Sequence, residues 1–154
     1  MKISFRAIGK THDPQLRMSI DDFTGRIRHY FPIEWTLIPA PKITSQAELM
    51  KAEAELILQT LKPGDYLIAL DEHGKQTDSP QLASLIEKQS FQSTRNLVFV
   101  IGGAFGFHQT ILDKADFVWS LSKLTFPHQL VRLILAEQVY RACTIIRNEK
   151  YHHS

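Results

Sequence analysis

The sequence is poor in cysteine and contains no long run of apolar residues. Its single cysteine, Cys143, excludes an internal disulfide, because that bond needs two thiols. No apolar stretch approaches the roughly 20 residues that a membrane-spanning helix requires. The first residues, MKISF, also lack the apolar segment and the small-residue cleavage site of a secretory signal. We therefore expect a cytoplasmic protein without a membrane segment.

A strong excess of charge of either sign is also missing. There are 18 Lys and Arg residues against 16 Asp and Glu residues, which gives a formal net charge of +2. That balance neither demands nor excludes a nucleic-acid partner. The segment from His128 onward is locally basic, with Arg132, Arg141, Arg147 and Lys150 against Glu137 and Glu149. A solvated end and a phosphate-binding surface both remain open, because phosphate contacts require Lys and Arg on one face.

The motifs of common hydrolases, metalloproteins and dinucleotide-binding enzymes do not occur. The histidines lack metal-ligand spacing, so we expect no metal site. There is no G-x-S-x-G elbow, and the adjacent Asp71 and Glu72 would point apart in an extended loop, which makes them a poor acid–base pair. Gly102, Gly103 and Gly106 do not follow the G-x-G-x-x-G order. By themselves they fit a tight turn as well as a binding loop.

Hydrophobic periodicity predicts strands that alternate with helices. Strands are expected at 2–8, 33–37, 66–70, 97–101 and 117–119, and helices at 14–28, from 45 to before 62, from 79 onward, at 108–115 and at 128–146. This alternation favours an α/β fold with a mainly parallel sheet and helices on both faces. At 154 residues, one domain spanning 1–154 is expected.

Two continuous apolar runs, 66–70 and 97–101, are typical of strands buried on both faces of a parallel sheet. The second run leads directly into Gly102 and Gly103, and the next short strand opens into a polar loop before Pro127. Ligands of open α/β sheets bind beyond the carboxyl ends of the strands, where glycines allow a close approach of the backbone. The stretch 96–127 is therefore predicted to form the ligand site.

The helix at 128–146 has more apolar residues than a surface helix needs. They surround much of its circumference: Leu130, Val131, Leu133, Ile134, Leu135, Val139, Tyr140, Ile145 and Ile146. One side is expected to pack on the sheet and another side on a partner.

A series of short motifs also runs through the chain in a defined order. It consists of LD at 70–71, GK at 74–75, SPQLA at 79–83, IGG at 101–103 with Gly106, WSLS at 119–122, LT at 124–125, PH at 127–128, LVR at 130–132, AEQ at 136–138, YRA at 140–142 and YH at 151–152. The ordered set resembles the RlmH (YbeA-type) family of the SPOUT superfamily. These bacterial enzymes methylate a pseudouridine of large-subunit ribosomal RNA at ring nitrogen N3. The resemblance extends over the length of the chain.

This resemblance implies a C-terminal trefoil knot, S-adenosylmethionine as the methyl donor, and a homodimer packed through the last helix. It also implies which residues would bind the cofactor. They are Leu70, Gly102, Gly103, Leu121, Ser122, Lys123, Leu124, Thr125 and Phe126. Backbone groups would hold the adenine and methionine ends, and apolar side chains would form a wall.

By the same resemblance, Tyr151 and His152 are the catalytic residues, and they would reach into the partner protomer's pocket to position the base. Arg132 and Arg141 would contact phosphate of 23S ribosomal RNA in the assembled ribosome or hold the dimer together. The family usually carries Arg or Lys after the Tyr-His pair, whereas this chain has His153, also expected to contact RNA. Methyl transfer from a sulfonium needs no metal, only an aligned acceptor whose proton is removed.

Two other classes of function remain open from the sequence. One is a ribosome- or RNA-binding factor that has this fold without catalytic activity. The other is a Rossmann-type enzyme that binds a nucleotide such as NAD. The second is disfavoured by the missing acidic residue at the end of a following strand.

Overall fold

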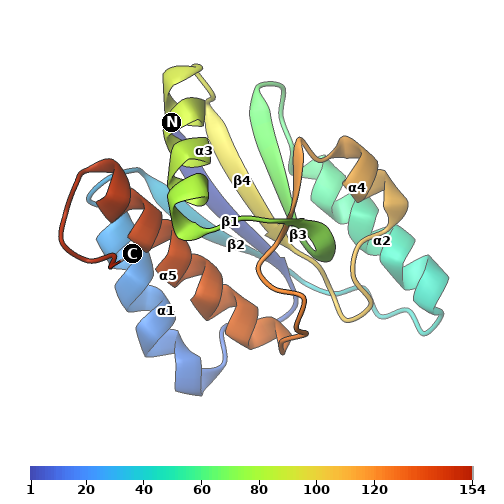
Figure 1. Ribbon diagram of the computed structural model, residues 1–154. Coiled ribbons are helices and arrows are strands. Elements are labelled where there is room, and N and C mark those ends of the chain that lie inside the picture. Colours follow the sequence, from blue (N-terminus) through green and yellow to red (C-terminus); the bar gives the residue numbers. More distant parts are fainter. Residues whose placement is uncertain (154) are drawn as a thin grey trace.

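The computed structural model describes residues 1–153, in which five strands form one sheet with helices on both faces (Figure 1). The strands are β1 (Lys2–Ile8), β2 (Ile33–Ile38), β3 (Asp65–Gln76), β4 (Asn96–Ile101) and β5 (Phe117–Ser120). The helices are α1 (Pro14–Ile27), α2 (Gln46–Gln59), α3 (Ser79–Phe91), α4 (Gln109–Lys114) and α5 (His128–Ile146). All pairings between these strands are parallel, which confirms the predicted α/β fold. The trefoil knot and the single domain over 1–154 stay predictions.

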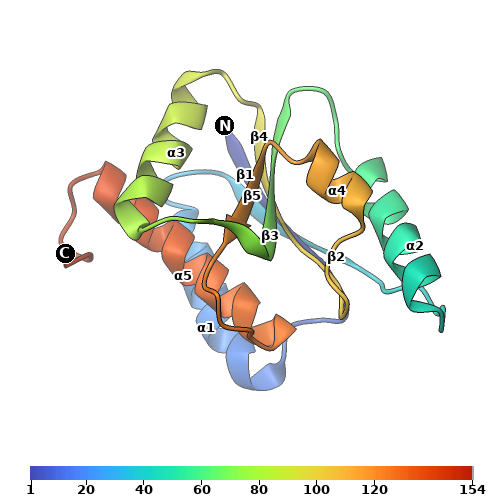
Figure 2. The same ribbon diagram turned by 45° about the vertical axis from the view of Figure 1, so that its right-hand side comes forward.

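The strands lie in the order β2-β1-β4-β3-β5, so β4 is central. Phe5 of β1 is opposite Trp35 of β2 and Phe99 of β4. The Phe5 ring meets both neighbours edge to face, with centroid distances of 4.9 Å to Trp35 and 5.6 Å to Phe99. Helices α1, α3 and α5 cover this face of the sheet, and α2 and α4 cover the other (Figures 1 and 2).

The continuous apolar run of β4 is explained by burial on both sides. Leu97, Phe99 and Ile101 join the core beneath α1, α3 and α5, whereas Val98 and Val100 join the core beneath α2 and α4. Successive side chains of a strand point to opposite faces, so a strand covered on both faces needs apolar residues at every position. This is the arrangement that the sequence pattern predicted.

β3 is longer than predicted, because it continues through a bulge instead of ending at Leu70. Both Leu70 and Lys75 pair with Trp119 of β5, so residues 71–74 are left out of the ladder. A side chain at Gly74 would place its Cβ 2.5 Å from the carbonyl oxygen of Val118, which explains why only glycine fits there. The bulge directs Asp71 and Glu72 to the carboxyl-end edge of the sheet.

The helix caps differ in quality. The sequence Ser45-Gln-Ala-Glu48 has the pattern of a capping box, but only one half of the box forms, as a 3.5 Å contact from the Glu48 N–H to Ser45 Oγ. A complete capping box begins α3 instead: the Gln81 N–H donates to Asp78 at 2.7 Å, and the Asp78 N–H donates to the Gln81 side chain at 2.8 Å.

We expect the substitution Asp78→Ala to lower the free energy of unfolding by about 1 kcal/mol, because it leaves an N-terminal N–H of α3 without an acceptor. Ser45→Ala is the matched control and should cost less, since its hydrogen bond is long. Chemical denaturation of both variants measures the difference. Equal losses would contradict the ranking of the two caps.

Candidate active site

A cavity of about 600 Å³ lies at the carboxyl ends of β3, β4 and β5, where the sequence predicted the ligand site. Most of the residues predicted to bind the cofactor line it: Leu70, Gly102, Gly103, Leu121, Ser122, Leu124, Thr125 and Phe126. Lys123 is exposed and does not belong to the lining. The structure therefore brings three segments, far apart in the sequence, to one cavity of the size usual for small-molecule ligands.

A tight glycine turn forms one wall of the cavity. The Gly106 N–H donates to the Gly103 carbonyl at 3.2 Å, and Gly106 has φ +82°, a conformation that favours glycine. A side chain at Gly102 would contact the Phe107 ring at 3.2 Å. One at Gly103 would place its Cβ 2.4 Å from a carboxylate oxygen of Glu53. These glycines keep the backbone itself at the cavity surface.

The opposite wall is the loop between β5 and α5. The Ser120 hydroxyl donates to the Ser122 carbonyl at 2.8 Å, and the Leu124 N–H donates to Ser122 Oγ at 3.0 Å. These serine contacts shape the loop and leave the Leu124 side chain 69% exposed at the cavity. The loop thus offers backbone groups together with an apolar surface.

The charged side chains in the lining are acidic. Asp71 and Glu72 line the cavity, and among the described residues no Lys or Arg does so. Sequence reasoning treated this pair as a plain loop, although its position directly after the Leu70 strand end could have indicated a site residue. An acidic lining suits a ligand that carries positive charge.

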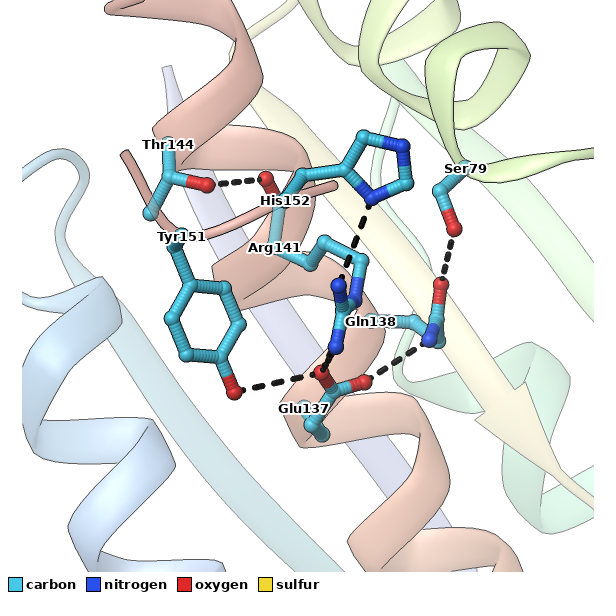
Figure 3. Close-up of polar contacts among 7 residues, drawn as sticks. All are labelled: Ser79, Glu137, Gln138, Arg141, Thr144, Tyr151 and His152. Carbon is cyan, nitrogen blue, oxygen red and sulfur yellow. Dashed lines mark hydrogen bonds and ion pairs between the residues drawn. The ribbon is translucent and has the colours of Figure 1, made fainter. Parts of the chain in front are cut away.

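The chain end lies at the other end of α5 and forms a polar cluster there (Figure 3). Arg141 pairs with Glu137, with 2.9 Å from Nε to Oε1, and the Tyr151 hydroxyl donates to the same oxygen at 3.3 Å. The Arg141 guanidinium also lies 4.8 Å from the Tyr151 ring centroid. Burial, followed by the Glu137 charge, raises the pKa of Tyr151, so its phenol stays protonated and acts as a donor.

His152 is held by the same cluster. Arg141 Nη1 lies 3.3 Å from His152 Nδ1, and because arginine only donates, Nδ1 is the acceptor and the proton of a neutral ring is on Nε2. Neither Tyr151 nor His152 lines the first cavity of its own chain. His152 lines a second cavity of about 530 Å³ that shares Trp119 and Leu121 with the first.

A chain of hydrogen bonds connects the cluster to α3. The Ser79 hydroxyl donates to Gln138 Oε1 at 2.7 Å, and Gln138 Nε2 donates to Glu137 Oε2 at 2.7 Å (Figure 3). Sequence analysis included Ser79, Glu137 and Gln138 in motifs but assigned them no role. The sequence could not predict the contact between Ser79 and Gln138, because the two residues are 59 positions apart.

The comparisons with known proteins decide the family. A family model described as "Predicted SPOUT methyltransferase" matches residues 1–152. The chain belongs to the SPOUT methyltransferase family. Similar proteins named "Ribosomal RNA large subunit methyltransferase H" come from Parabacteroides distasonis (45% identical, 99% of each chain covered) and Cytophaga hutchinsonii (44% identical, 99% of this chain and 100% of the relative). Another, from Trichlorobacter lovleyi, is 42% identical over 99% of this chain and 100% of the relative. The resemblance stated from the motifs is confirmed.

Within this SPOUT methyltransferase, the three residues predicted to bind RNA have different surroundings. Arg132 is 1% exposed, and its Nη1 donates to the Lys10 carbonyl at 2.8 Å. Arg141 is engaged by Glu137, and His153 is exposed. Arg132 therefore ties α5 to the segment after β1, and the three RNA-binding roles stay predictions.

This SPOUT protein shows neither a membrane-spanning helix nor a metal cluster within its described residues. Across residues 1–153, no helix is both long and apolar enough to cross a membrane. Within the same range, no group of three or more His, Cys, Asp or Glu residues is placed to hold a metal ion.

Proposed function

We propose that this protein transfers a methyl group from S-adenosylmethionine to ring nitrogen N3 of a pseudouridine in 23S ribosomal RNA, acting on the assembled large subunit in the cytoplasm. The observation that carries the proposal is the cavity at the strand ends, in which the three segments implied by the family resemblance meet. Family membership and the printed names of the relatives support the reaction and the substrate class.

The residues present fit S-adenosylmethionine. The turn at 102–106 and the loop at 121–126 offer backbone N–H and C=O groups for the adenine and methionine ends, and Leu70, Leu124 and Phe126 offer an apolar wall. Asp71 and Glu72 suit the positive sulfonium, which supplies an electrophilic methyl group when bound. We therefore assign cofactor binding to this cavity.

The chain-end cluster would position the acceptor base. The Tyr151 hydroxyl donates its one proton to Glu137 and can accept a hydrogen bond from an N–H of the base, and the neutral His152 ring can donate from Nε2. N3 must lose its proton while it attacks the methyl carbon. His152 could accept that proton only after Nδ1 leaves Arg141, because Nε2 already carries a proton. Positioning of the base is therefore the better-supported role of this pair, because alignment alone contributes strongly to the rate.

A homodimer is part of the proposal. The stripe Leu130, Leu133, Ile134, Glu137 and Arg141 runs along α5, and its members are only partly buried within the protomer. The apolar half of this stripe suits a second copy, which would cover it. Since Tyr151 and His152 do not reach the first cavity of their own chain, the dimer would bring them to the partner's cavity.

The decisive experiment measures transfer from labelled S-adenosylmethionine to ribosomes from a strain that lacks the modification. We expect one methyl group per assembled large subunit, located on a pseudouridine, and little transfer to protein-free ribosomal RNA. Cofactor binding without any transfer would contradict the proposed RNA target and favour a non-catalytic binding factor. Absence of both binding and transfer would overturn the methyltransferase assignment for this chain.

A further inference from the structure

Glu53 of α2 is buried directly behind the glycine turn of the first cavity. Its side chain is 4% exposed, and both carboxylate oxygens lie within 2.7 Å of the position that a Cβ on Gly103 would occupy. The carboxylate can lie there only because Gly103 has no side chain. The signal in the sequence is an acidic residue on the apolar face of α2, between Met50 and Ile57 at helical spacing.

This carboxylate has no partner among the described residues. Burial raises the pKa of Glu53, and neither a hydrogen bond nor a nearby opposite charge acts against that effect. Buried acids are normally hydrogen-bonded or paired, because an isolated charge is costly to desolvate. Asp71 differs, since it lies 3.4 Å from His73 Nδ1. Within the described residues, Glu53 is therefore an acid of low exposure that has neither a hydrogen bond nor an ion pair.

Glu53 lies behind the glycine turn that lines the first cavity. Gly102, Gly103, Gly106 and Phe107 line both that cavity and the small space around Glu53. His108 is the only other titratable side chain around that small space, and no Lys or Arg among the described residues lines it. A negative charge behind the turn acts on the cavity through protein rather than water, so it is weakly screened.

Resting on the proposed function, we propose that Glu53 is a specificity-determining residue, whose negative charge behind Gly103 makes the cavity prefer S-adenosylmethionine to S-adenosylhomocysteine. Methyl transfer breaks the bond from sulfur to the methyl carbon, forms the bond to N3 and releases the N3 proton. The positive sulfonium thereby becomes a neutral thioether. The attraction of Glu53 for the ligand is lost at that moment, so the spent cofactor leaves and a fresh one enters.

The test compares the affinities of both ligands by calorimetry at about pH 8, roughly three to four units above the ordinary pKa of a glutamic acid. We expect Glu53→Gln to weaken S-adenosylmethionine binding by on the order of tenfold, because the substitution removes a unit charge that acts on the ligand through protein rather than water. Binding of S-adenosylhomocysteine should stay within about twofold. The matched control is Glu55→Gln, an exposed acid on the same helix, which should change neither affinity.

A second uncharged variant distinguishes the loss of the Glu53 charge from a loss of folding. Glu53→Met suits the apolar surroundings of α2 and should reproduce the change in the ratio of the two affinities, while thermal denaturation confirms that the protein is folded. Equal weakening of both ligands would show a merely structural role and overturn the proposal, as would unchanged affinities. If the unaltered protein bound neither ligand, the proposed function itself would fail. That result differs from a failure of the Glu53 proposal, in which the unaltered protein still binds S-adenosylmethionine.

Discussion

Gly74→Ala is expected to destabilise the protein by about 2–3 kcal/mol and to abolish measurable cofactor binding. The added Cβ would lie 2.5 Å from the oxygen and 2.7 Å from the carbon of the Val118 carbonyl, and 2.9 Å from the Trp119 nitrogen. These are backbone atoms of β5, which cannot rotate away as a side chain can. Relief of the clash would move β5, and β5 leads into the loop that forms a wall of the first cavity.

The measurements are chemical denaturation and calorimetric titration with S-adenosylmethionine. Gly25→Ala provides the control, because nothing lies within 4 Å of its added Cβ and the position is inside α1. That substitution should stabilise the protein by about 0.5–1 kcal/mol, since alanine favours a helix over glycine. A Gly74→Ala protein with unchanged stability and affinity would show that the bulge does not support the cavity.

Glu137→Gln is expected to lower methyl transfer by about a hundredfold while cofactor affinity stays within about twofold. Three contacts converge on the Glu137 carboxylate: Arg141, the Tyr151 hydroxyl and the Gln138 amide. The amide of a glutamine keeps the size of the side chain but removes the charge that holds Arg141, which in turn contacts His152. A displacement of catalytic groups by about 1 Å can cost a hundredfold in rate.

Single-turnover transfer to ribosomes measures this effect separately from cofactor binding. Asp22→Asn is the matched control, because Asp22 and Arg26 form an ion pair with the same i,i+4 spacing, at 3.1 Å, on the exposed face of α1. It should leave transfer unchanged, since exposed pairs contribute little. If Glu137→Gln transferred methyl groups at the unaltered rate, the cluster would not be needed to position Tyr151 and His152.

The predictions from sequence were most successful where local patterns govern the structure. The predicted helix at 14–28, observed as Pro14–Ile27, the strand at Lys2–Ile8 and the buried run of β4 are confirmed, because caps and hydrophobic periods act over a few residues. The position of the cavity followed from glycines directly after a buried strand. The predicted end of the strand β3 at Leu70 was wrong. Residues Asp71 to Gly74 form a bulge, in which Gly74 lies against the backbone of Val118, and the strand continues beyond it.

The sequence by itself thus determined the order of strands and helices, the apolar faces and, through its ordered motifs, the family. Only the tertiary structure decided the strand order β2-β1-β4-β3-β5, the burial of Arg132, and the meeting of Ser79 with the chain-end cluster. It also placed Glu53 behind Gly103, 50 positions further along the chain. Such contacts depend on how whole elements pack, and no local pattern records which distant residue will fill the space that a glycine leaves.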